Sequence, residues 1–187
     1  MERNIVFIAL FAALIAVLGF IPAITLGFGV PITAQTLGVM LCGTILGARR
    51  GALAVLLFLV LVLLGLPLLA GGRGGIEVLA RPSVGFLIGW PVAAFVTGLI
   101  VEKVRSAPLG LVATMASIIG CIIVMYVFGI VGLALNLDKP LYEASLLVVA
   151  FIPGDIIKAV IAGLVTNALF VARPNSILSR TPVQPVA

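Results

Sequence analysis

The segment "FIPGDIIKAV", residues 151–160, places two oppositely charged side chains inside an otherwise apolar run. Asp155 and Lys158 are three residues apart, so on a helix they lie on one face. A charged side chain near a bilayer centre costs about 2.5–3.5 kcal/mol on insertion scales, and such residues usually have a function. One interpretation is that the two groups only neutralise each other. The interpretation we favour is that both face a polar cavity and contact a ligand that carries hydrogen-bond donors and an anion.

Pro153 lies inside the same run and must kink or start the helix, because proline cannot donate a backbone hydrogen bond. If the helix begins there, Asp155 lies in its first turn, where free N–H groups and the helix dipole favour polar ligands. Residues 144–152 would then form an apolar cap over the site.

A second segment, "PLLAGGRGGIEVLARPS" at 67–83, surrounds one arginine with glycines. Gly72 and Gly74 permit positive φ and close approach of the backbone to a ligand. The Arg73 guanidinium can bind a carboxylate through two hydrogen bonds. The alternative is a flexible turn with a solvated arginine. Arg81 is expected to extend to the membrane interface or to reach the same ligand.

Uncharged polar residues in "GVPITAQTLGVMLCG", residues 29–43, are further hydrogen-bonding candidates. Thr33, Gln35 and Thr36 would either contact a ligand or bond to neighbouring helices. Three aromatic residues are candidates for an apolar wall of the site: Phe86, Trp90 and Tyr126. Core packing or anchoring at the interface is the alternative for Trp90.

Several kinds of chemistry are excluded by composition. The chain has no histidine, which removes histidine-based triads and zinc sites. It contains no P-loop, so any ATP-driven step needs a partner. Cys42 and Cys121 lie in apolar segments and are expected to be packing residues. We therefore predict no catalytic residues, no metal and no cofactor.

The elements that carry these residues are membrane spans. The chain is 63% hydrophobic and 9% charged, whereas soluble domains carry roughly 25% charged residues. Long uncharged runs separate Arg3 from Arg49 and Arg105 from Asp138, and a spanning helix needs about 20 apolar residues. We predict an all-α membrane protein of six transmembrane helices, forming one domain over residues 1–172. The predicted spans are about 4–21, 34–48, 51–69, 83–103, 108–134 and 145–171. A polar, disordered tail is expected at 173–187.

Orientation follows from the distribution of lysine and arginine. Seven of these residues fall on one side of the predicted spans, and the positive-inside rule makes that side cytoplasmic. The seven are Arg3, Arg49, Arg50, Lys103, Arg105, Arg173 and Arg180. Both termini are therefore predicted in the cytoplasm, and Arg73 and Arg81 outside.

Alanines recur in the first predicted helix, "IALFAALIAVLGF". Small residues four apart let two helices approach closely, either within the protein or against another membrane subunit. Ala9 with Ala13 gives one such face, and Ala12 with Ala16 gives the alternative.

Four motifs in this order, "PITAQTLGVMLCGTILGARRG", "GLPLLAGGRGG", "RPSVGFLIGW" and "PGDIIKA", resemble BioY, the family of biotin-specific S components of energy-coupling factor transporters. The resemblance runs from the first helix to about residue 171. It implies a six-helix fold that binds biotin at its extracellular side under loop lids. It also implies a transmembrane coupling (T) subunit and two ABC-type ATPases as partners, and toppling in the membrane to release the vitamin.

The same resemblance implies roles for single residues. It puts Asp155 and Lys158 in the biotin pocket, makes Arg73 a lid or carboxylate-binding residue, and assigns Ala9 and Ala13 to docking on the T subunit. Where the family often has Gly-Pro-Thr, this chain has Arg81-Pro82-Ser83, which leaves the role of Arg81 open. The main hypothesis is a vitamin-capture subunit in a prokaryotic cell membrane. The alternatives are an S component for another vitamin, or an intramembrane enzyme using Asp155 and Lys158.

Overall fold

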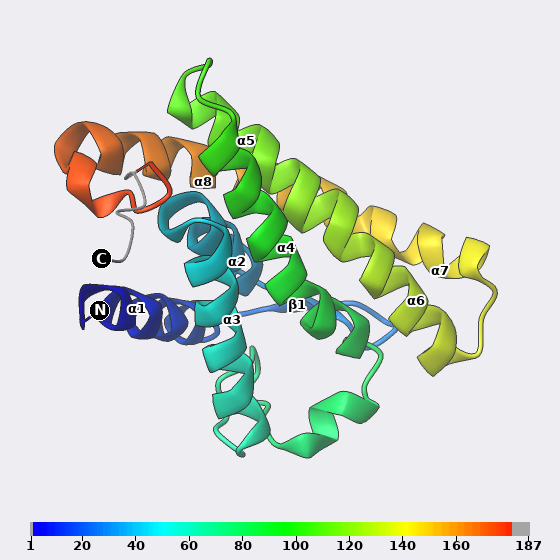
Figure 1. Cartoon of the computed structure of the whole chain (residues 1–187). Coiled ribbons are helices and arrows are strands. Elements are labelled where there is room, and N and C mark those ends of the chain that lie inside the picture. The colour runs from blue at the N-terminus through cyan, green and yellow to red at the C-terminus, as the bar shows by residue number, and fades with distance from the viewer. Residues whose placement is uncertain (1, 181–187) are drawn as a thin grey trace.

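The computed structural model describes residues 2–180 and shows a bundle of long helices (Figure 1). Six helical rods follow one another in the order of the six predicted spans. Three rods are single helices: α1 (Glu2–Leu18), α3 (Ala48–Leu63) and α4 (Val84–Lys103). The second rod is α2 (Gln35–Leu41) continued by the π-helical turn η1 (Cys42–Leu46), and the fifth is α5 (Leu109–Ile118) continued through the π-helical η3 (Ile119–Val124) into α6 (Met125–Leu137). The sixth is α7 (Leu141–Val148) continued through the 3-10 turn η4 (Val149–Phe151) into α8 (Ile152–Ala172).

Three of these rods are long and apolar enough to cross a membrane: Val84–Lys103, Leu109–Leu137 and Leu141–Ala172. The rods α1 and α3, with 17 and 16 residues, and the apolar stretch Gln35–Leu46 are shorter. An all-α, multi-pass membrane fold is thus confirmed.

The polypeptide between α1 and α2 forms a small ribbon that the sequence did not predict. Strands β1 (Ile24–Thr25) and β2 (Pro31–Ile32) pair antiparallel. The second span was predicted to begin at about residue 34, and helix α2 begins at Gln35, directly after the ribbon. The ribbon brings residues 30–33 over the outer ends of the helices.

The loops predicted to be cytoplasmic gather at one end of the bundle, called the inner end. Arg3 donates a hydrogen bond to the Asn175 carbonyl oxygen. The Ala48 N–H donates to Glu102 Oε1 over 2.9 Å, which caps α3. Figure 1 shows the N-terminus beside the end of α8. The opposite end, called the outer end, carries Arg73, which follows the third rod, and Asp155, which lines the same cavity.

The segment after α8 corrects the predicted tail. A 3-10 turn, η5 (Pro174–Ser176), is followed by Ile177, Leu178 and Ser179, which are all buried. The Ser179 N–H donates to the Ile45 carbonyl oxygen over 3.0 Å, and its hydroxyl donates to the Thr44 carbonyl oxygen over 2.6 Å. Since these backbone acceptors lie at the end of η1, residues 174–180 are packed rather than disordered. Residues 181–187 of the predicted tail lie outside the described part of the chain.

Helix α4 is the centre of the bundle, and both π-helical turns pack against it. A Cβ added to Gly43 in η1 would lie 2.7 Å from the Ala94 oxygen, and one added to Gly120 in η3 would lie 2.6 Å from the Ala93 oxygen. No real Cβ atom tolerates such distances, so only glycine permits these backbones to approach α4 so closely.

This packing predicts that Gly43→Ala destabilises the protein by about 1–3 kcal/mol, because the added methyl group must displace α4. The midpoint of thermal unfolding in detergent should fall by several degrees. The matched control is Gly27→Ala, since a Cβ at Gly27 would meet nothing within 4 Å. Equal midpoints for the two variants would contradict the central role of this contact.

Candidate ligand-binding site

A cavity opens between the helices at the outer end of the bundle. It contains about 550 Å³ of space, including the part open to solvent. Most of its wall is apolar, with a few polar groups that converge. The lining residues are Val30, Pro31, Ile32, Thr33, Gln35, Thr36, Leu69, Arg73, Ser83, Phe86, Leu87, Trp90, Met125, Tyr126, Phe151, Asp155 and Lys158.

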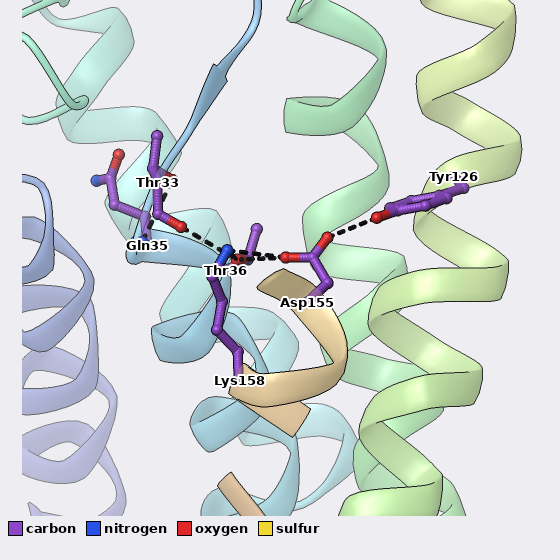
Figure 2. A network of polar contacts seen from close by, with 6 residues as sticks. All are labelled: Thr33, Gln35, Thr36, Tyr126, Asp155 and Lys158. Atoms are coloured by element: carbon purple, nitrogen blue, oxygen red, sulfur yellow. Dashed lines mark hydrogen bonds and ion pairs between the residues drawn. The ribbon is translucent and has the colours of Figure 1, made fainter. Parts of the chain in front are cut away.

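An ion pair between Asp155 and Lys158 forms the polar centre of this cavity (Figure 2). Lys158 Nζ lies 2.8 Å from Asp155 Oδ1 and donates to the Thr36 hydroxyl over 2.9 Å. The Tyr126 hydroxyl donates to Asp155 Oδ2 over 2.7 Å. The side chains therefore pair with each other, as the first interpretation expected, and also line a cavity, while contact with a ligand stays a prediction.

Three rods hold this network in place. Asp155 lies in the first turn of α8, where Pro153 is accommodated because the helix starts there. Thr36 comes from the first turn of α2 and Tyr126 from α6, close to the π-helical η3. Of the predicted apolar cap at 144–152, only Phe151 lines the cavity, whereas α7 packs on α6.

Arg73 projects from a tight turn at the rim. Leu69 and Arg73 exchange two backbone hydrogen bonds, and Gly71 and Gly72 between them have φ of 79° and 68°. The glycines are therefore required by the turn itself. Burial, and secondarily the neighbouring Arg81, lowers the pKa of Arg73. The Arg73 Nε–H donates to the Ala70 carbonyl oxygen over 2.9 Å. Within residues 2–180 the guanidinium forms no ion pair, so its terminal N–H groups are available to an anionic ligand.

The other residues predicted in this loop lie elsewhere. Gly72 and Arg81 line an adjoining, wider hollow that shares Arg73 with the cavity, so this hollow forms a vestibule at the outer end. Gly74 lines neither space. A Cβ on it would lie 2.7 Å from the Leu66 carbonyl carbon, so this glycine serves packing within the loop.

Gln35 lines the cavity, but its amide group joins three segments of the chain. Its Nε2 donates to the carbonyl oxygens of Ile15 in α1 and Leu68, over 3.1 and 3.0 Å. Its Oε1 accepts from the Ala70 N–H over 3.0 Å. Both donors and the acceptor are engaged, so this side chain positions the turn that carries Arg73 against α1.

Aromatic side chains form the remaining walls. Phe86 contacts Tyr126 and Phe151, and Phe28 contacts Phe151, with ring centroids 5.7–6.2 Å apart. Trp90 lies against Phe58 at 6.1 Å. Sequence reasoning found Phe86, Trp90 and Tyr126 but missed Phe151 and Met125, because an apolar residue that faces a cavity has no distinguishing pattern. The hydroxyl of Thr33 accepts from the Gln35 N–H at 3.3 Å.

The structure distinguishes the two alanine faces of α1. Ala12 is buried and Ala16 is half-buried, so this pair packs inside the bundle. Ala9 and Ala13 are exposed, together with Leu10 and other large apolar residues of α1. The exposed pair is thus the face available to another helix.

The chemistry of the site is that of binding. The described residues contain no group of three His, Cys, Asp or Glu side chains that could hold a metal ion. The free thiols of Cys42 and Cys121 are buried in the bundle. An acceptor, an ammonium donor and an available guanidinium together fit a ligand with N–H groups and a carboxylate.

Comparison with known proteins agrees with this geometry. A sequence model of the BioY family matches residues 2–175. A protein described as biotin transporter BioY from Rhodobacter capsulatus is 54% identical, over 96% of this chain and 100% of the relative. A second biotin transporter BioY, from Rhizobium etli, is 52% identical over 92% and 95% of the two chains.

A solved structure has a similar fold. The crystal structure of the S-component for biotin from an ECF-type ABC transporter matches with a TM-score of 0.85 and 32% sequence identity. The match covers 90% of each chain.

The buried ion pair predicts the order of unfolding stability in a double-mutant cycle. Asp155→Leu and Lys158→Met should each destabilise the ligand-free protein by about 3–5 kcal/mol, because each leaves an uncompensated charge. The double variant should be more stable than either single variant. Thermal unfolding in detergent measures this order, and a double variant at the sum of the single losses would contradict it. The control, Lys139→Ala, breaks the exposed Lys139–Glu143 pair and should change stability by less than about 1 kcal/mol.

Proposed function

The chain belongs to the BioY family, and from this premise we propose that it captures biotin at the outer face of the membrane as the S component of an importer. The observation that carries the proposal is the Asp155–Lys158 pair, which lines the cavity near the available Arg73. The family consists of transporter components, so the chain acts by binding and not by catalysis. Its multi-pass fold places it in a cell membrane.

The polar groups of biotin match the polar groups of the cavity. Biotin has a ureido ring with two N–H donors and one carbonyl acceptor, an apolar bicycle with a thioether, and a valerate chain ending in a carboxylate. Asp155, as a carboxylate, can only accept hydrogen bonds, so it suits the ureido N–H groups. Phe86, Phe151 and Trp90 suit the apolar bicycle.

Charge complementarity supports the same orientation. Asp155, Lys158 and Arg73 together give the cavity one net positive charge, which the biotin carboxylate neutralises. The guanidinium of Arg73 at the rim is positioned to receive that carboxylate, and Arg81 in the vestibule adds to the attraction. Gly72 supplies the backbone turn that carries Arg73. Thr33, Gln35 and Tyr126 complete the wall.

Delivery of biotin inward requires partners. The chain has no nucleotide-binding loop, so we propose a T subunit and two ABC-type ATPases that hydrolyse ATP for it. The exposed Ala9 and Ala13 of α1 give the T subunit a surface that permits close helix packing.

Titration calorimetry of biotin into the purified chain tests the pocket. The wild type should bind one biotin per chain, and Asp155→Asn should weaken binding about 100-fold or more, because a buried charge-assisted hydrogen bond is lost. Arg73→Gln should weaken it less. Lys103→Ala, at the inner end, should bind like the wild type. A folded wild type without biotin binding would overturn the proposal.

Docking through α1 predicts a separation of binding from transport. Ala9→Trp should leave biotin affinity unchanged but reduce biotin uptake at least tenfold in cells that contain the whole transporter, because the bulky ring prevents close helix approach. Ala168→Trp places the same ring on an exposed site of α8 and serves as the control. Equal uptake by both variants would remove α1 from the docking surface.

A further inference from the structure

Trp90 contains a hydrogen-bond donor that the protein leaves unused. Its side chain is only 5% exposed, and it lines the cavity. Its Nε1–H is shielded from solvent and has no hydrogen-bond partner among residues 2–180. Buried donors are nearly always paired, because an unpaired one keeps the full penalty of losing water. At the wall of a binding cavity, a ligand with a hydrogen-bond acceptor would supply the missing partner.

Several other donors at this cavity already have partners, while one N–H of Lys158 and the terminal N–H groups of Arg73 have none among residues 2–180. The Tyr126 hydroxyl donates to Asp155, Lys158 donates to Asp155 and Thr36, and the Gln35 amide donates to two backbone carbonyl oxygens. The indole ring packs against Phe58, with ring centroids 6.1 Å apart. The indole N–H is therefore distinct from the polar network around the ion pair.

We propose that the Trp90 Nε1–H donates a hydrogen bond to the ureido oxygen of bound biotin and makes the site specific for a carbonyl at that position. The inference rests on the proposed function and assigns Trp90 a role beyond that of an apolar wall.

Elimination among the acceptors of biotin selects the ureido oxygen. The valerate carboxylate is drawn to Arg73 at the rim, whereas Trp90 lies about two helical turns into α4 from its outer end. A thioether sulfur is a weak acceptor and would compensate poorly for the lost hydration of the N–H. In the cyclic ureido group the two N–H bonds diverge on either side of the carbonyl, so Asp155 can accept from one of them but cannot pair with the oxygen, which needs a donor.

The test is a cycle of two proteins and three ligands, measured by titration calorimetry. The proteins are the wild type and Trp90→Phe. The ligands are biotin, 2-iminobiotin and desthiobiotin. At neutral pH 2-iminobiotin carries a cationic guanidinium group with N–H donors in place of the ureido oxygen, and desthiobiotin keeps the ureido group but lacks the sulfur. Lost packing in Trp90→Phe weakens all three ligands alike, whereas a lost hydrogen bond changes only the preference for the carbonyl.

We expect Trp90→Phe to reduce the ratio of biotin affinity to 2-iminobiotin affinity by roughly tenfold or more. This factor corresponds to the free energy of one hydrogen bond. The preference for biotin over desthiobiotin should stay within about twofold. An unchanged biotin to 2-iminobiotin ratio would overturn the inference, and so would a change confined to desthiobiotin, which would assign the donor to the sulfur. If the folded wild type binds none of the three ligands, the proposed function itself fails.

Discussion

The ion pair of Asp155 and Lys158 inside an apolar bundle is the interaction around which the outer half of this protein is organised. Removing two charges from water costs several kcal/mol, and their attraction recovers this only when further hydrogen bonds complete the geometry. Tyr126 from α6 and Thr36 from α2 supply those bonds, so the pair holds three rods at fixed positions. A protein selected only for stability would place apolar residues here, and the retained charges therefore indicate a ligand.

The two ends of the bundle are built by different means. Toward the inner end, glycines in the π-helical turns allow η1 and η3 to lie directly on α4. The Ser179 hydroxyl donates a hydrogen bond to the Thr44 carbonyl oxygen in η1. At the outer end, the segments are joined by side chains that hydrogen-bond to backbone groups, and not by close contact between backbones. Gln35 is the main example, because one amide joins α1, α2 and the turn that carries Arg73.

Much of the fold was predictable from the sequence, because uncharged runs separated by charged loops are what a bilayer requires. The charged site residues were predictable for the same reason, since a charge in such a run is costly. The ribbon was missed because two-residue strands leave no periodic pattern. For Gln35, bonding to a neighbouring helix was one of the two predicted roles, but the partners could not be named because they are backbone groups 20 and 33 residues away along the chain. Phe151 and Met125 were missed because a side chain that lines a cavity and one that faces lipid can be equally apolar. The packed segment 174–180 was mistaken for a disordered tail because its composition is polar, although three of its side chains are buried.

The rods differ in length, and this has a consequence for the surrounding lipid. The 17 residues of α1 extend over about 25 Å, whereas the 29 residues from α5 to α6 extend over about 43 Å. The hydrocarbon core of a bilayer is about 30 Å thick, so lipid must thin beside α1, while the long rod must tilt. Thinning has a small free-energy cost that disappears when protein replaces lipid at that surface. The hydrophobic belt therefore favours protein over lipid beside the two short rods, α1 and α3, which pack on each other.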